Sequence, residues 1–91
     1  MEEKSQQTEL TERELTIYGS EVRLILYECG KKQYEFAYFI DKPVGFVRQN
    51  LYYSRDPIPV FYAEALARFI GEKYYRSTLH KIRTKPIPGL E

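Results

Sequence analysis

Few side chains in this 91-residue sequence have the chemistry of a catalyst. Ser77 and His80 lie three positions apart, so on a helix they would be neighbours. A serine nucleophile also needs a carboxylate to orient its base and an oxyanion site, and the sequence indicates neither. Because serine–histidine pairs at helical spacing arise easily by chance, we predict that the protein is not an enzyme.

Cofactor and metal sites are also not predicted. Gly30-Lys31 lacks the second glycine and the Ser/Thr of a phosphate-binding loop. Cys29 and His80 are the only residues of their types, and metal sites usually need clustered ligands. We therefore expect no cofactor, no metal and no small-molecule substrate.

The single cysteine cannot form an internal disulfide, which fits a reducing compartment, and we expect a cytoplasmic protein. No apolar run reaches the roughly 20 residues that span a bilayer, so no membrane segment is expected. Residues 1–12 are acidic and polar and are predicted to be a disordered leader. A single domain is predicted over residues 13–85, followed by a tail at 86–91 whose final Leu90-Glu91 resembles a cloning scar.

Charge is distributed unevenly along the chain, although the net charge is only +1. Residues 1–14 contain five glutamates, whereas residues 68–85 contain six cationic side chains and one acidic side chain. Cations near the end of a helix complement its dipole, and this is the preferred interpretation of the basic segment. A phosphate-binding patch is the alternative.

The strongest periodic signal runs from Pro57 to Ile82 and predicts one long amphipathic helix. Its apolar stripe comprises Ile58, Phe61, Tyr62, Ala65, Leu66, Phe69, Ile70 and Tyr74. Gly71 is unfavourable in a helix interior and could interrupt it. Predicted core aromatic residues are Phe39, Phe61, Tyr62 and Phe69.

The preceding segments are rich in β-branched and aromatic residues, which is typical of strands. Residues 21–29 and 33–41 are predicted to form a hairpin around a two-residue loop at Gly30-Lys31. Residues 46–53 are predicted to be a third strand; a short helix is the alternative, because Val47 and Leu51 lie four apart. The predicted fold is therefore α+β: an antiparallel β-meander of three to four strands with one long C-terminal helix packed on one face.

Alternation in the predicted hairpin places aromatic side chains together on one sheet face. The residues assigned to this predicted interaction surface are Arg23, Ile25, Tyr27, Tyr34, Phe36 and Tyr38. One helix can cover only one face of a sheet, so these rings would face solvent, and large apolar patches usually mark interaction sites. The leading functional hypothesis is a small protein-interaction or self-associating module that binds a protein partner or forms a homodimer.

The alternative hypothesis is a protein that binds single-stranded nucleic acid. Aromatic rings on a sheet can stack on bases, while cations contact phosphates. The candidate cations are Arg23, Lys31, Lys32 and Arg48. Three glutamates on the same hairpin, Glu21, Glu28 and Glu35, weigh against this hypothesis.

Overall fold

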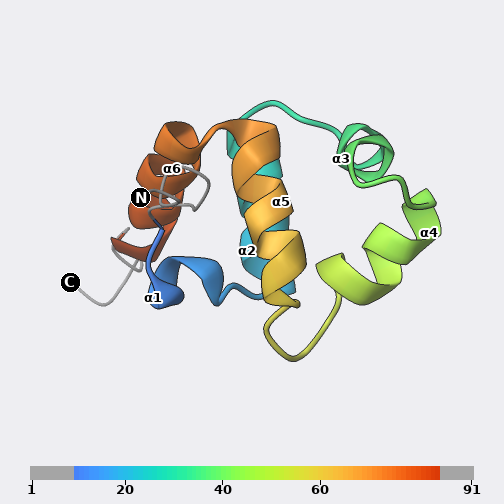
Figure 1. Ribbon diagram of the computed structural model, residues 1–91, viewed down its shortest axis with the longest axis horizontal. Coiled ribbons are helices and arrows are strands. Elements are labelled where there is room, and N and C mark those ends of the chain that lie inside the picture. The colour runs from blue at the N-terminus through green and yellow to red at the C-terminus, as the bar shows by residue number, and fades with distance from the viewer. Residues whose placement is uncertain (1–9, 85–91) are drawn as a thin grey trace, which may run out of the picture.

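The computed structural model describes residues 10–84, and all regular structure in that range is helical (Figure 1). The elements are α1 (Glu12–Leu15), α2 (Gly19–Glu28), α3 (Gln33–Phe39), α4 (Val44–Phe46), η2 (Val47–Tyr52), α5 (Val60–Ile70) and α6 (Glu72–Thr84). The predicted α+β fold, with its β-meander, is therefore wrong. The helical alternative for residues 46–53 is the interpretation that matches, because α4 continues directly into η2; we refer to the two as the α4–η2 helix.

The predicted leader and tail fall largely or wholly outside the described residues. Where the described part begins, Leu10 is buried and Thr11 caps α1. The backbone N–H of Glu14 donates to Thr11 Oγ1 (3.2 Å), and Glu14 Oε1 accepts from the Thr11 N–H (2.8 Å). This reciprocal pair is a capping box, which satisfies two N–H groups that a helix start otherwise leaves without partners.

Helical spacing of apolar residues explains why the predicted hairpin segments are helices. Val22, Ile25 and Leu26 fall on one face of α2 and are all buried. In α2 and α3 the third residue is a glutamate whose carboxylate accepts from the backbone N–H three residues earlier. Glu21 accepts from Tyr18 (3.0 Å) and Glu35 from Lys32 (2.7 Å).

Gly30 ends a helix instead of forming the predicted hairpin loop. It has a φ of 68°, its N–H donates to the Tyr27 carbonyl (3.1 Å), and the Lys31 N–H donates to the Leu26 carbonyl (2.9 Å). This pair of bonds is the Schellman arrangement, which closes a helix through a left-handed residue. A glycine with a positive φ is typical of this kind of helix end and also of a two-residue hairpin loop. The sequence around Gly30 is therefore compatible with either structure.

The predicted long C-terminal helix is two helices, α5 and α6, separated at Gly71, whose φ is 104°. The two pack side by side, and α2 packs against α6 and η2 (Figure 1). Leu66 is buried as the stripe implies, but Phe61 is 64% exposed and was wrongly assigned to the core.

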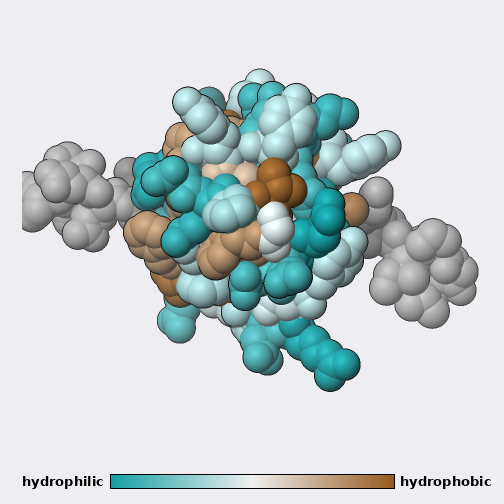
Figure 2. All heavy atoms as spheres, turned by 90° about the vertical axis from the view of Figure 1, so that its right-hand side faces the viewer, coloured by the Kyte–Doolittle hydropathy of each residue, from teal (hydrophilic) through white to brown (hydrophobic). Residues whose placement is uncertain are grey.

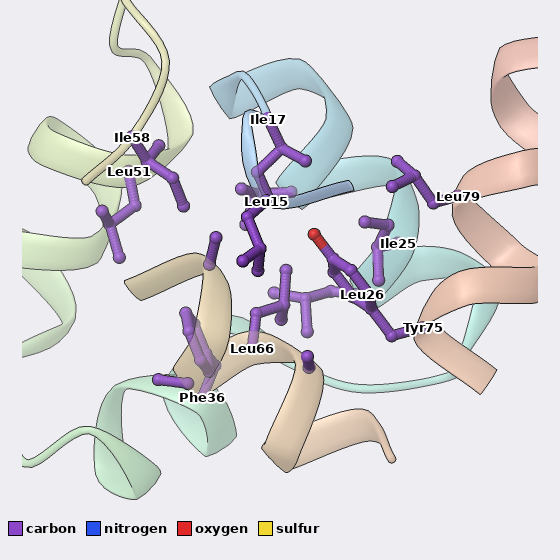
Figure 3. Close-up of a cluster of buried hydrophobic side chains, with 14 of the residues drawn as sticks. Leu15, Ile17, Ile25, Leu26, Phe36, Leu51, Ile58, Leu66, Tyr75 and Leu79 are labelled. Carbon is purple, nitrogen blue, oxygen red and sulfur yellow. The ribbon is translucent and has the colours of Figure 1, made fainter. Parts of the chain in front are cut away.

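Figure 3 shows the main core, in which side chains from all the larger helices meet. Tyr75 of α6 is fully buried at its centre, and its hydroxyl donates to the backbone carbonyl of Glu14. Burial raises the pKa of the Tyr75 phenol, so the group stays neutral and keeps its donor hydrogen.

The end of α6 is fastened to the start of the described chain by Arg83. Its Nε lies 2.7 Å from Glu21 Oε2, and its terminal nitrogens donate to the carbonyls of Arg13 (3.0 Å) and Thr16 (2.9 Å). Hydrogen bonds to charged groups contribute more than neutral ones, about 1.5–3 kcal/mol each when shielded from water.

Replacing Gly19 should destabilise the fold. A Cβ at this position would lie 2.2 Å from the Tyr52 carbonyl oxygen, a backbone atom that cannot swing aside. We expect Gly19→Ala to cost at least the about 1–3 kcal/mol typical of overpacking, measured by urea unfolding. Gly45→Ala is the matched control: its Cβ would meet nothing within 4 Å, so it should be neutral or slightly stabilising. Equal stability of the two variants would contradict the close contact.

Acid should weaken the Glu21–Arg83 contact. Burial raises the pKa of Glu21, but the hydrogen bonds from Arg83 and from the Tyr18 N–H outweigh burial, and the net pKa is lowered from 4.5. A lowered pKa in the folded state stabilises the protein fully above pH 4.5, and this contribution is lost as the pH falls below that value. In unfolding experiments between pH 7 and 3, Glu21→Gln and Arg83→Ala should each be less stable at pH 7 and lose less stability on acidification. If the free energy of unfolding of both variants fell with pH in parallel with that of the wild type, this assignment would be contradicted.

Candidate functional site

The most distinctive surface feature is a helix–turn–helix unit, which comprises α3, residues 40–43 and the α4–η2 helix. In Figure 1, α3 is seen nearly end-on while the second helix lies across the view, so the two cross steeply. Asp41 adopts a left-handed conformation (φ 59°), and the Lys42 N–H donates to the Ala37 carbonyl (3.0 Å), which closes α3 in the same way as Gly30 closes α2. The result is a tight four-residue turn.

The inner face of this unit is fixed by buried apolar side chains. Phe36 and Ala37 anchor α3, and Val47 and Leu51 anchor the second helix; all four are at most 1% exposed. Residues four apart lie on the same side of a helix, so this anchoring sets which side of the second helix faces solvent.

The outer face of the second helix is polar. Gly45, Arg48, Gln49 and Asn50 are all exposed. Arg48 Nη2 also lies 3.4 Å from Gln33 Oε1 at the start of α3, so the polar face continues across both helices. These side chains carry donors and acceptors that can bind a polar partner in directions that the fold determines.

The second helix contains a widened turn. The Tyr53 N–H donates to the Arg48 carbonyl five residues earlier (3.2 Å), as in a π-helix. Asn50 Nδ2 also donates to the Phe46 carbonyl oxygen (3.2 Å). Single widened turns occur often at functional sites.

Both ends of the second helix are braced. At its start, the Phe46 ring packs edge-on against Tyr62 of α5, with ring centres 5.5 Å apart. At its end, Arg23 Nη1 donates to the Tyr52 carbonyl (2.6 Å). Burial raises the pKa of the Tyr52 phenol, although nearby Arg23 opposes this, so the phenol is neutral at physiological pH.

Positive charge is concentrated around the unit. Residues 31–55 contain five cationic side chains and two acidic ones, whereas the whole chain has a net charge of only +1. The five are Lys31, Lys32, Lys42, Arg48 and Arg55, and all are exposed. Figure 2 views the molecule from the side of α3 and α4: apolar surface lies in the middle of this face and toward its left edge, and hydrophilic side chains cover much of the rest.

The residues of the predicted aromatic interaction surface do not share a sheet face. Ile25 and Phe36 are buried in the core, and Arg23 is half-buried and hydrogen-bonded to Tyr52. Tyr27, Tyr34 and Tyr38 are exposed, at 79%, 62% and 89%. The six residues lie on α2 and α3 and not on paired strands, so the strand alternation that was expected to align them is absent. Tyr34 and Tyr38, four apart on α3, still share one side of that helix.

Of the cations proposed for nucleic-acid binding, Lys31, Lys32 and Arg48 do flank the helix–turn–helix unit, whereas Arg23 is engaged with Tyr52. Gly45, Gln49 and Asn50 are not among the residues that the sequence predicts to be functional. The available signal was the polar run Arg48-Gln49-Asn50 between Val47 and Leu51, which is typical of a helix with one buried side.

Elsewhere in residues 10–84, no three His, Cys, Asp or Glu residues are grouped as metal ligands would be. The Ser77 hydroxyl donates to the Tyr74 carbonyl (3.3 Å). The described helices include none whose length and apolarity would let it cross a bilayer.

Substitutions at Phe36 and Tyr38 distinguish the core from the surface on one helix. Phe36→Ser should cost about 3–5 kcal/mol or prevent folding, because it empties a buried site. Tyr38→Ser should change stability by less than about 0.5 kcal/mol, because the ring is 89% exposed. Thermal unfolding of the two variants measures this. Similar losses at both positions would contradict the helical assignment of residues 33–39.

Comparisons with protein-family models, with curated proteins and with solved structures found no match to this chain.

Proposed function

We propose that this protein binds double-stranded DNA through its helix–turn–helix unit, with the α4–η2 helix in the major groove. The observation that carries the proposal is the exposed polar face of that helix, held outward by the buried Val47 and Leu51. In DNA-binding proteins of this architecture, a second helix after a short turn contacts base edges while the first helix crosses the backbone.

The exposed side chains suit base recognition. Arginine pairs with the O6 and N7 atoms of guanine, and glutamine or asparagine pairs with N6 and N7 of adenine. Arg48 and Gln49 are adjacent on the exposed face, and Gly45, one turn earlier, carries no side chain that would hold the helix away from the bases. Asn50 already donates to a backbone carbonyl, so Arg48 and Gln49 are the main candidates for base contacts.

The surrounding cations suit phosphate binding. Lys31 and Lys32 precede α3, and Lys42 lies in the turn. Contacts of this kind orient a protein on the duplex without reading sequence. The concentration of positive charge in residues 31–55 supports an anionic partner for this face, despite the near-neutral chain.

Single-stranded nucleic acid is less favoured than duplex. The aromatic stacking platform was inferred from a sheet, and the described residues contain none. A protein partner stays a prediction that rests on the exposed tyrosines. A reducing, cytoplasmic environment, expected from the single cysteine, fits the proposed function.

Selection from a random duplex library, followed by fluorescence anisotropy, tests the proposal. We expect the full chain to enrich a short motif and to prefer duplex over single strand. Binding should weaken with salt, in proportion to the number of phosphates contacted. Arg48→Ala and Gln49→Ala should each lose about 1–3 kcal/mol of binding free energy and relax preference at one base position, with the melting temperature unchanged.

The matched control is Lys73→Ala, which removes an exposed cation from α6, outside the proposed interface. It should bind the selected duplex like wild type. The proposal is wrong if no motif is enriched, if single strands bind equally well, or if Lys73→Ala is as harmful as Arg48→Ala.

A further inference from the structure

An exposed apolar segment lies next to the proposed DNA-binding helix. We call residues 55–61 the proline segment; it contains Pro57 and Pro59 and leads into α5. Val60 and Phe61 are 50% and 64% exposed, although both are large apolar side chains. Neither is needed to fill the core.

The proline segment is held in one conformation. Ile58 is buried, and its N–H donates to the Ile17 carbonyl (2.8 Å), which fastens the segment to the residues before α2. Pro57 and Pro59 fix their own φ angles on either side of this anchor. The Ser54 hydroxyl donates to the Asp56 carbonyl (2.9 Å). A surface that is already ordered loses little conformational entropy on binding.

A row of rings connects this segment to the helix–turn–helix unit. The Phe61 ring packs edge-on against Tyr62, with centres 5.1 Å apart, and Tyr62 packs against Phe46 of α4 at 5.5 Å. A partner seated on Val60 and Phe61 would therefore sit beside the proposed DNA-binding helix.

The edge of the proline segment carries one positive and one negative side chain, so it is complementary in charge to the same edge of a second copy. Arg55 and Asp56 are adjacent, exposed, and without ion-pair partners among residues 10–84. A two-fold interface brings the same patch of both copies together, so Arg55 of one copy can face Asp56 of the other. An unrelated acidic or basic partner would satisfy only one of the two charges.

We infer that the proline segment is the docking site for a second copy of this chain. The exposed parts of these side chains amount to a few hundred Å² per copy, below the about 800 Å² per partner of a stable complex. The dimer is therefore weak in solution and forms at high protein concentration. Duplex DNA strengthens it by holding two copies next to each other.

The DNA part of this inference rests on the proposed function. Helix–turn–helix dimers place two half-sites about 34 Å apart along the duplex. The described part of the chain measures 48 × 33 × 24 Å, so two copies can lie side by side on such a pair. A half-site alone offers one helix few base contacts, which is why a second copy would increase both affinity and specificity.

Sedimentation equilibrium of the full chain from 10 µM to 1 mM, without DNA, tests the dimer itself. We expect a monomer–dimer equilibrium that Phe61→Ser weakens by about tenfold or more, because a buried aromatic ring at the centre of an interface contributes strongly. The fold should be unchanged, since Phe61 is mostly exposed. Tyr38→Ser, which removes an exposed ring from α3, is the control and should associate like wild type.

Charge reversal identifies the partner as a second copy in this orientation. Arg55→Asp and Asp56→Arg place like charges against each other in their own dimers, so each variant alone should associate more weakly than wild type. A mixture of the two should associate more tightly than either variant alone, because opposite charges then meet. A merely structural role for these residues would not produce this recovery.

The inference is overturned if the wild-type chain stays monomeric up to 1 mM, if Phe61→Ser associates like wild type, or if mixing the two charge variants gives no recovery. None of these outcomes bears on DNA binding by a single copy. Conversely, a dimer with these properties and no affinity for duplex would overturn the proposed function and leave the interface standing. With both intact, selected duplexes should contain paired half-sites, and Phe61→Ser should bind one half-site like wild type while losing cooperativity on two.

Discussion

The close approach of α2 to the end of η2 determines where the proposed DNA-binding helix lies. Gly19 leaves room for the Tyr52 carbonyl, and Arg23, one turn further along α2, donates to the same oxygen at 2.6 Å. These contacts fix the end of the helix, and Phe46 against Tyr62 fixes its start. With both ends held, Val47 and Leu51 point into the core and Arg48 and Gln49 are left on the surface. The polar face therefore depends in part on a backbone contact at the end of the helix that makes no contact with the bases itself.

The widened turn of η2 divides the polar residues into two roles. The Asn50 side chain donates to the Phe46 carbonyl of the same helix, so Asn50 supports the helix. Arg48 makes only a long contact with Gln33, 3.4 Å, which a better partner such as a guanine edge can replace at little cost. The existing hydrogen bonds therefore separate Asn50, which supports the helix, from Arg48, which can change partner to contact a base.

The sequence contained more of the fold than the strand prediction used. Aromatic and β-branched residues favoured strands, but Val22, Ile25 and Leu26 also have helical spacing, and burial against η2 and α6 decided between the two. Thr11 and Glu14 also have the spacing of a capping box, and the structure forms both of its hydrogen bonds. The possible break at Gly71 was foreseen, as was the burial of Leu66. The role of Gly19 could not be read locally, because it depends on Tyr52, thirty-three residues away.

Cationic side chains that already pair with a carboxylate in the fold are less available to bind DNA phosphates than cationic side chains without such a pair. The basic segment near the C-terminus looked like the alternative phosphate-binding patch. However, Arg76, Lys81 and Arg83 contact Glu14, Glu28 and Glu21 at 3.0, 3.2 and 2.7 Å, so they hold α6 against α1 and α2. Lys31, Lys32 and Lys42 make no such pairs in the described part of the chain. Few phosphate contacts then remain for one copy, and its affinity for arbitrary DNA should be low. A protein of this kind gains useful affinity from base contacts and from a second copy beside it, which is why the polar helix and the proline segment belong to one functional surface.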